Sequence, residues 1–184
     1  MTTIPIQPRF KAGNRHPNTQ ISLVVMHATA GSSLIGAIET LRKRGLSYHY
    51  LIDKNGKIYK GCPYSLVAYH AGSSYGPKED SARISIKQNK AAIFVAGTCV
   101  NSYSIGIAFV NKNDGIDPYT KEQFDAAEEL INELSRVLPL KHITTHYWVS
   151  PRRKTDPKGF DIVALAEAVD LDLWIWKRPT NSGV

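Results

Sequence analysis

The run ISLVVMHA at residues 21–28 is apolar and β-branched along almost its whole length. A run of this length that ends in the turn-forming sequence TAGSS is typical of a buried strand. A buried strand needs partners beside it and layers around it, so this run is the expected centre of a sheet. The chain of 184 residues is long enough for one domain built around such a strand.

Helical patterns alternate with the strand patterns. Ser33 can cap a helix that carries basic residues in its last turn and ends at Gly45. Thr120 and Gln123 form a capping-box pattern for a second helix, which we expect to run to about residue 136. Asp161 is the expected N-cap of a third helix at residues 161–169.

One hairpin interrupts this alternation. Lys54-Asn55-Gly56 separates two aromatic and β-branched runs at 47–53 and 57–62, which is a strong hairpin signal. The other expected strands are 65–72, 104–110 and 141–148. We therefore predict an α/β fold, with a single-domain mixed β-sheet flanked by helices. The expected organisation is a loosely packed lead-in at 1–20, a domain at 21–172 and a tail at 173–184.

Composition narrows the class of partners. Lys and Arg number 23 against 16 Asp and Glu, a formal charge of +7, which favours anionic partners such as nucleic acid, anionic lipid or an acidic wall polymer. No nucleic-acid-binding motif supports the first of these. No apolar run is long enough to span a bilayer, and the N-terminus lacks the apolar core of a signal peptide. We expect synthesis in the cytoplasm, any export by a separate route, no stable membrane insertion, and a monomer.

The two cysteines, Cys62 and Cys99, lack the spacing of a metal or redox motif, and two cysteines do not make a disulfide scaffold in a chain of this length. We interpret both as buried or idle thiols.

Two histidines stand at the ends of expected strands. His27 closes the run 21–28, and His146 follows Ile143-Thr144-Thr145. Strand ends gather at one edge of an α/β sheet, so the two imidazoles can converge. Asp156, in the proline-containing segment after His146, can supply a third ligand for a tetrahedral zinc ion with one open position. The competing interpretation is that each histidine is a hydrogen-bonded structural residue.

Five blocks of sequence carry a family resemblance: VVMHATAG, SYHYLIDKNGKIYKG, AYHAGSS, NSYSIGIAFV and THYWVSPRRKTDPKGFD. In this order they resemble the zinc-dependent N-acetylmuramoyl-L-alanine amidases of the type 2 amidase and peptidoglycan-recognition-protein superfamily. The resemblance covers roughly residues 20–170 and is closest to the short phage-type enzymes, the endolysins. It implies that His27, His146 and Asp156 are the zinc ligands, and that Lys154 and Tyr48 are catalytic.

The same resemblance bears on His49, His70 and Ala108. His49 and His70 are similar to residues that line the substrate groove, although packing or hydrogen bonding within the sheet is an equal alternative. Ala108 stands where many bacterial members carry a glutamate that activates the zinc-bound water. Short phage enzymes also lack that glutamate and use the tyrosine, which favours Tyr48. Asp161 is a rival ligand that we interpret as a helix cap.

The resemblance implies hydrolysis of the amide between N-acetylmuramic acid and L-alanine in peptidoglycan, a bacteriolytic activity of the endolysin type. Alternatives are a cytosolic amidase that recycles muropeptides and a peptidoglycan-binding module without catalysis. Arg152, Arg153 and Lys158 are candidates for a cationic rim that attracts the acidic wall, although each is also an ordinary solvated residue.

Overall fold

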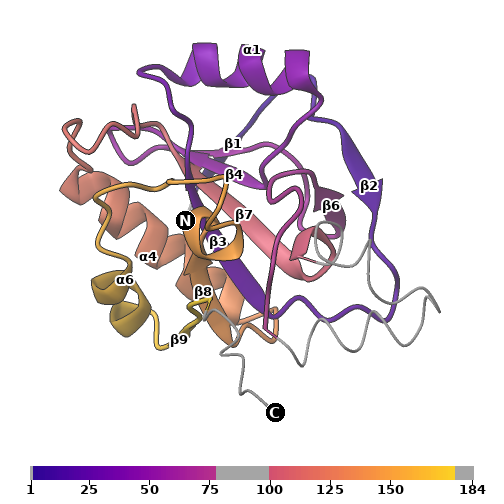
Figure 1. Ribbon diagram of the computed structural model, residues 1–184. Helices are drawn as coiled ribbons and strands as arrows, with labels where there is room; N and C mark the ends of the chain where they lie inside the picture. The colour runs from indigo at the N-terminus through magenta and orange to yellow at the C-terminus, as the bar shows by residue number, and fades with distance from the viewer. Residues whose placement is uncertain (1, 78–99, 177–184) are drawn as a thin grey trace.

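The structure is a computed structural model that describes residues 2–77 and 100–176 (Figure 1). Within these ranges seven strands form one sheet in the order β1-β5-β4-β7-β3-β8-β9, and β2 and β6 form a small second sheet. The strands of the large sheet are β1 Thr3–Pro5, β3 Leu23–Ala28, β4 Tyr50–Ile52, β5 Ile58–Lys60, β7 Ser104–Phe109, β8 His142–Thr145 and β9 Asp172–Leu173. Those of the small sheet are β2 Ala12–Asn14 and β6 Leu66–Ala68, and the helices are α1 Leu34–Arg44, α4 Lys121–Ser135, α5 His146–Val149 and α6 Ile162–Ala168.

Strand β3 lies between β7 and β8 and runs parallel to both. Every residue of β3 is buried, as the apolar run predicts. The hairpin β4–β5 supplies the antiparallel pairing that makes the sheet mixed. The turn at Gly56 has φ of +75°, a left-handed conformation that glycine adopts without strain. The predicted α/β fold with a mixed sheet is therefore confirmed.

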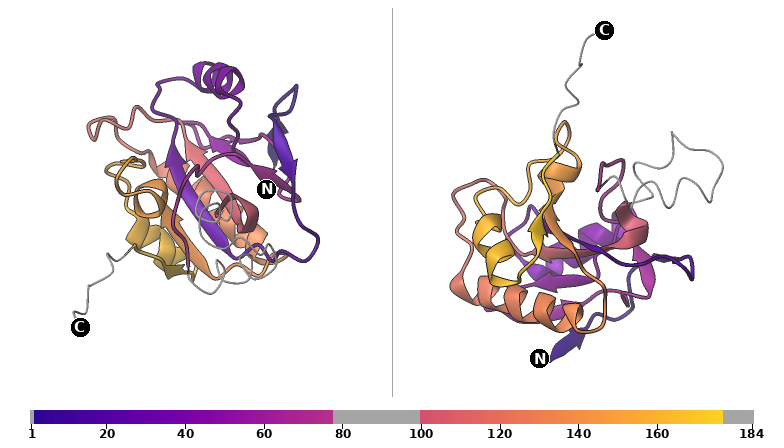
Figure 2. Two further views of the ribbon diagram at one scale, coloured as in Figure 1. Left: turned by 45° about the vertical axis from the view of Figure 1, so that its right-hand side comes forward. Right: turned by 90° about the horizontal axis from the view of Figure 1, so that it is seen from below.

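Helices α4 and α6 pack on one face of the sheet (Figure 2). Val24 and Met26 of β3 belong to this larger core, whereas Leu23 and Val25 point to the opposite face, because successive side chains of a strand alternate. On that opposite face α1 packs through Ala37 and Leu41 against Leu51 of β4. By the same alternation His27 belongs to the face of Leu23 and Val25, away from α4.

The predicted helix boundaries agree with the structure. The Ser33 hydroxyl accepts from the N–H of Gly36 at 3.2 Å, and Gly45 ends α1 with φ of +64°. Thr120 and Gln123 form the reciprocal capping box of α4. Asp161 accepts from the N–H of Ala164 at 3.0 Å, so it is the cap of α6 that the sequence predicts.

The prediction of one strand over 141–148 is wrong beyond Thr145. Strand β8 ends there, and the Thr145 hydroxyl accepts from the N–H of Trp148 at 3.2 Å, capping the one-turn helix α5. The apolar and aromatic content of 146–148 is the same for a strand and for this turn. The threonine cap decides between them, because it satisfies an N–H that a strand would pair with its neighbour.

The expected loose packing of residues 1–20 is also wrong. Strand β1 pairs in parallel with β5, β2 pairs with β6, and Ile6 and Phe10 are each only 5% exposed. Arg15 donates to the main-chain oxygens of Tyr64 at 3.2 Å and Leu66 at 2.8 Å. The lead-in is thus tied to the sheet by backbone pairing and by an arginine that donates to carbonyls, features that a polar, proline-containing sequence does not display.

The chain is partly ordered beyond residue 172 as well. The N–H of Trp174 donates to the Ile143 carbonyl at 2.9 Å, which extends the pairing of β9 with β8. Cys62 is buried and its thiol is free, and burial raises its pKa to about 12, in keeping with the predicted idle thiol. Cys99 lies outside the described residues. Among the described residues, no helix is both long and apolar enough to cross a membrane.

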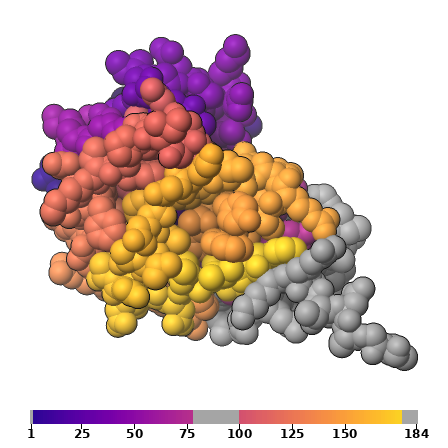
Figure 3. All heavy atoms as spheres, turned by 60° about the vertical axis from the view of Figure 1, so that its left-hand side comes forward, coloured from indigo at the N-terminus to yellow at the C-terminus, as the bar shows by residue number. Residues whose placement is uncertain are grey.

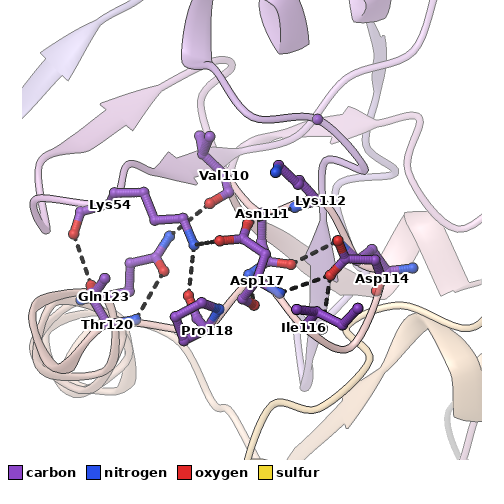
Figure 4. Close-up of polar contacts among 12 residues, drawn as sticks. Lys54, Val110, Asn111, Lys112, Asp114, Ile116, Asp117, Pro118, Thr120 and Gln123 are labelled. Carbon is purple, nitrogen blue, oxygen red and sulfur yellow. Dashed lines mark hydrogen bonds and ion pairs between the residues drawn. The ribbon is translucent and has the colours of Figure 1, made fainter.

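The loop between β7 and α4 is fixed by a polar network (Figure 4). Lys54 of the hairpin turn donates to Asp117 at 2.8 Å, while Asp117 also accepts from the N–H of Lys112 at 2.9 Å. Beside it, the buried amide of Gln123 donates to the carbonyls of Ile52 at 3.2 Å and Val110 at 3.1 Å. Gln123 therefore joins α4 to the ends of two neighbouring strands, β4 and β7.

We predict that Gln123→Leu destabilises the fold by about 1–3 kcal/mol. Leucine has a similar volume but removes the side-chain donor from both carbonyls, and Ile52 keeps only the N–H of Val110 as a donor. Urea unfolding followed by circular dichroism measures this loss. Glu122→Gln, an exposed change on the same turn, is the matched control and should alter stability by less than about 0.5 kcal/mol. Equal stabilities for the two variants would contradict the role given to Gln123.

Candidate active site

His27 lies at the carboxyl end of β3, on the face of the sheet opposite α4 and α6. Its side chain is fully buried, and its partner in register on β7 is Ala108. Paired residues of neighbouring strands present their side chains on the same face, so Ala108 borders His27 directly. Position 108 therefore supplies no carboxylate to the imidazole.

His146 and Asp156 meet because the segment between them folds back on itself. The N–H of Tyr147 donates to the Asp156 carbonyl at 2.9 Å, which brings residue 156 beside the first turn of α5. The carboxylate then points at the end of β3, where its Oδ2 accepts from the N–H of Ala28 at 3.4 Å. The irregular, proline-containing segment thus reaches from the end of β8 to the end of β3.

Three potential ligand atoms converge at this point. Oδ2 of Asp156 lies 3.1 Å from Nδ1 of His146 and 3.3 Å from Nδ1 of His27. The ligand atoms of His27, His146 and Asp156 all lie within 4.8 Å of one another, and all three residues are buried. The structure therefore brings together the three residues that the sequence analysis proposes as zinc ligands.

The positions of the protons on the two imidazoles decide whether the site favours a cation. Nε2 of His146 lies 3.3 Å from the Ala71 carbonyl, and Nδ1 lies 3.1 Å from Oδ2 of Asp156. When the ring proton is on Nε2 and is donated to the carbonyl, Nδ1 is bare and faces the carboxylate. Nδ1 of His27 is buried and has no hydrogen-bond partner despite its closeness to Asp156. Two bare nitrogens facing a carboxylate repel one another unless a positive ion lies between them. The residues present therefore fit a metal ion.

Charge in the site follows from burial. Burial, and then the neighbouring His146, lower the pKa of His27 to about 4, so this imidazole is neutral at pH 7. Burial raises the pKa of Asp156, but the imidazoles of His146 and His27 outweigh it and hold the pKa well below its usual range. His27 and Asp156 are thus in the forms in which they bind a metal, a neutral imidazole and a carboxylate.

A cavity of about 160 Å³ opens beside these atoms. Tyr48, Lys154 and Asn113 line it together with His146 and Asp156. The Tyr48 ring lies 4.9 Å from the His27 ring, centre to centre. Burial, followed by the charge of Asp156, raises the pKa of Tyr48, so its hydroxyl is a proton donor rather than a phenolate base at neutral pH.

His49 and His70 differ from each other in their surroundings. His49 is fully buried: its Nδ1 accepts from the N–H of Gly106 at 3.0 Å and its Nε2 lies 3.1 Å from the Leu66 carbonyl. It has no free face for a substrate and occupies the structural role that the sequence left as the alternative. His70 borders the cavity, and its Nδ1 lies 3.0 Å from Nε2 of His27.

The cations nearest the cavity are only partly those expected. Arg153 donates to Ser150 at 2.8 Å and Lys158 to the Asp114 carbonyl at 3.0 Å, so both hold neighbouring backbone or side chains. Arg44, at the end of α1, lines the cavity beside Lys154. Arg44 was not predicted as a site residue, since a basic last turn is also the ordinary end of a helix.

The loop at 111–118 supports the segment that carries Lys154 and Asp156. Asn113, with φ of +59°, donates from its amide to the Thr155 hydroxyl at 3.1 Å and accepts from the N–H of Lys158 at 2.7 Å. In the space-filling view this loop, in salmon, lies against the segment, in orange (Figure 3). Asn113 thus forms hydrogen bonds to the chain before and after Asp156, at Thr155 and at Lys158, and its side chain also borders the cavity.

Comparison with known proteins bears on this geometry. The sequence profile of the Amidase_2 family, described as N-acetylmuramoyl-L-alanine amidase, matches residues 17–159. The chain belongs to this amidase family. The match contains every residue assigned to the site, and the family resemblance seen in the sequence blocks is confirmed.

Individual relatives of this amidase-family chain are distant. It is 29% identical over 115 residues to the 1,6-anhydro-N-acetylmuramyl-L-alanine amidase AmpD of Haemophilus influenzae, a match over 61% of this chain and 52% of that protein. The matched region thus spans about half the length of this curated relative.

Solved structures show the same fold. The N-acetylmuramoyl-L-alanine amidase LysC from Clostridium intestinale aligns with a TM-score of 0.67 at 21% identity, over 94% of this chain and 99% of that one. The N-acetylmuramyl-L-alanine amidase AmiD from E. coli, in complex with anhydro-N-acetylmuramic acid-L-Ala-D-gamma-Glu-L-Lys, aligns with a TM-score of 0.64 at 24% identity, over 88% and 62%.

The buried histidines make the stability of this amidase-family chain depend on pH. Burial lowers the pKa of His49 to about 3, whereas an unfolded histidine titrates near 6.5. Between these values the unfolded state binds more protons, so the free energy of unfolding falls as the pH falls from about 6.5 towards 3.

We predict that His49→Asn makes this fall shallower, because asparagine can still accept from the N–H of Gly106 but does not titrate. Urea unfolding of chelator-treated protein between pH 7 and 4.5 measures the slope, and the other buried histidines are common to both proteins. Parallel slopes for the variant and its parent would contradict the prediction.

Proposed function

We propose that this chain is a zinc-dependent amidase that hydrolyses the bond between N-acetylmuramic acid and L-alanine in peptidoglycan. The observation that carries the proposal is the convergence of His27, His146 and Asp156, within 4.8 Å of one another, beside a cavity in a chain of the amidase family. Two imidazoles and one carboxylate, with room for a further ligand, are a donor set typical of catalytic zinc.

Zinc held by these three residues would polarise the scissile carbonyl and lower the pKa of a bound water towards about 7. The remaining roles belong to the chain. Lys154 is half-buried at the cavity and offers a fixed cation for the negative charge that develops on the carbonyl oxygen. Tyr48, protonated and beside His27, can orient the water or donate a hydrogen bond or a proton to the reacting groups.

We further propose action on the intact bacterial wall, as in endolysins, rather than recycling of soluble fragments. This finer proposal is supported by Ala108, which borders His27 where a glutamate base would stand, and by Tyr48 in the cavity. The sequence resemblance associates that pairing with short phage enzymes. Comparable release of L-alanine amino groups from intact sacculi and from soluble anhydro-muropeptide would leave the two uses equal, and a strong preference for fragments would favour recycling.

The defining experiment is incubation of purified protein with peptidoglycan. We expect new L-alanine amino groups, suppression by a chelator, and recovery on addition of zinc. New reducing ends instead of amines would identify a glycosidase and overturn the proposal. Saturable binding of muropeptide without any released amine would favour the alternative of a non-catalytic recognition module.

Two substitutions separate metal binding from catalysis. Asp156→Ala should lose stoichiometric zinc, since it removes the carboxylate that faces both imidazoles. Lys154→Met should keep zinc and reduce the rate by about 10²–10³, the usual effect of removing one donor to an oxyanion. Metal analysis and amine release measure the two effects. Asp161→Ala is the matched control, because it removes a nearby carboxylate that caps α6, and it should retain zinc.

The basic lining of the cavity predicts recognition of a substrate carboxylate. The peptide in the AmiD complex contains a γ-linked D-glutamate, which leaves its α-carboxylate free. We predict that Arg44→Gln lowers kcat/KM for a substrate with this carboxylate, and lowers it much less when the carboxylate is amidated.

Lys43→Gln is the control for that experiment, because it removes the same charge one residue away, at a position that does not line the cavity. Equal losses with the acidic and the amidated substrate would show that Arg44 does not read the carboxylate.

A further inference from the structure

The dipeptide His70-Ala71 contacts both of the histidines that face Asp156. His70 Nδ1 lies 3.0 Å from Nε2 of His27, and the Ala71 carbonyl lies 3.3 Å from Nε2 of His146. Both contacts are buried. One short piece of the loop after β6 therefore supports the outer nitrogen of each proposed zinc ligand.

The position of this dipeptide is itself fixed from behind. The side-chain oxygen of Asn101 accepts from the N–H of His70 at 3.3 Å and from that of Ala71 at 2.9 Å. The absence of a side chain at Gly106 leaves room for the His70 ring, since a Cβ there would lie 2.6 Å from Cγ of His70. The ring is thus held between β7 and the imidazole of His27.

The direction of each hydrogen bond follows from the last acceptor in the chain. The Ser104 hydroxyl contacts the Val100 carbonyl, which can only accept, so the hydroxyl proton is directed there. The Ser104 oxygen, 3.2 Å from Nε2 of His70, is then left to accept from a protonated Nε2.

A neutral imidazole carries one proton, so Nδ1 of His70 is bare and accepts from Nε2–H of His27. His27 is then bare at Nδ1, the nitrogen that lies 3.3 Å from Asp156 and has no hydrogen-bond partner. The chain of contacts from Val100 to His27 therefore explains why this buried nitrogen is unpaired.

We propose that His70, set by Ser104, is a positioning residue that fixes the tautomer of His27, and that Ala71 does the same for His146. In this tautomer the Nδ1 lone pairs of both histidines point to the proposed metal position before the metal binds. This inference rests on the proposed function for the identity of the metal. Partners of ligating histidines commonly change metal affinity by about 10–100-fold when they are removed.

A matched pair of substitutions tests the proposal on the full chain. Asparagine and leucine have similar shapes, but asparagine can place its oxygen where Nδ1 of His70 stood. We expect His70→Leu to weaken zinc binding by about 10–100-fold and His70→Asn to restore most of it, measured by competition with a chromophoric chelator. Equal weakening in both variants, with both folded by circular dichroism, would indicate a packing role and overturn the proposal.

A spectroscopic measurement on the unmodified protein gives a decision even if a variant fails to fold. Nitrogen-15 NMR of the histidine rings at neutral pH, before and after zinc is added, reports which nitrogen carries the proton. In the metal-free protein we expect the proton of all three rings, His27, His70 and His146, to be on Nε2. Protonation of His27 at Nδ1 would overturn the proposal.

These readouts use no substrate, so they are separate from the test of amidase activity. A protein with the expected tautomers and zinc affinity but no released amines would retain the positioning role and lose the proposed reaction. A protein that binds no zinc would lose the proposed metal, while the NMR result would still decide how His70 orients His27.

Discussion

The burial of two imidazole nitrogens and one carboxylate oxygen at a single point is the constraint around which this structure is organised. Oδ2 of Asp156 lies 3.3 Å from Nδ1 of His27 and 3.1 Å from Nδ1 of His146, and the three ligand atoms lie within 4.8 Å of one another in a buried place. Such an arrangement costs free energy in the absence of a cation, because all three groups are buried and Nδ1 of His27 has no hydrogen-bond partner. The surrounding fold offsets this cost through strand pairing and hydrogen bonds that fix the position of each group.

The support comes from several parts of the chain. Strand β3, paired on both sides, fixes His27, while the return of residues 147–156 fixes Asp156 against the end of that strand. Asn113 holds the returning segment from the loop after β7, and that loop is tied to the hairpin turn by Lys54 and Asp117. The site is therefore a property of the whole sheet rather than of a local motif.

The sequence predicted the elements that have strong local signals. The buried run of β3, the Asn-Gly hairpin and the helix N-caps each encode their own structure, and strand-end histidines were enough to suggest convergence. The sequence did not indicate Thr3–Pro5 as a strand, because three residues that include proline show no readable periodicity. The turn from β8 into helix α5 was not predicted, although Thr145, three residues before Trp148, is an N-cap signal present in the sequence.

The supporting contacts of the site were hidden for a different reason. Ala71 acts through its main-chain oxygen, which every residue possesses, and His70 was identified only as a possible lining residue of the groove. Arg44 and Asn113 reach the cavity because of how a helix and a loop are placed in space. Hydrogen bonds to backbone and contacts between distant segments depend on tertiary structure, so a single sequence does not report them.

The sequence separation within the site has a thermodynamic consequence. The carboxylate of Asp156 meets the end of β3 across 128 residues of chain. A metal ion coordinated by His27 and Asp156 would act as a reversible cross-link that closes most of the polypeptide into one loop. In the unfolded chain these ligands are far apart, so the binding energy of the ion contributes to the folded state alone. The ion would then stabilise the fold as well as support catalysis, and its removal would lower the free energy of unfolding and abolish activity together.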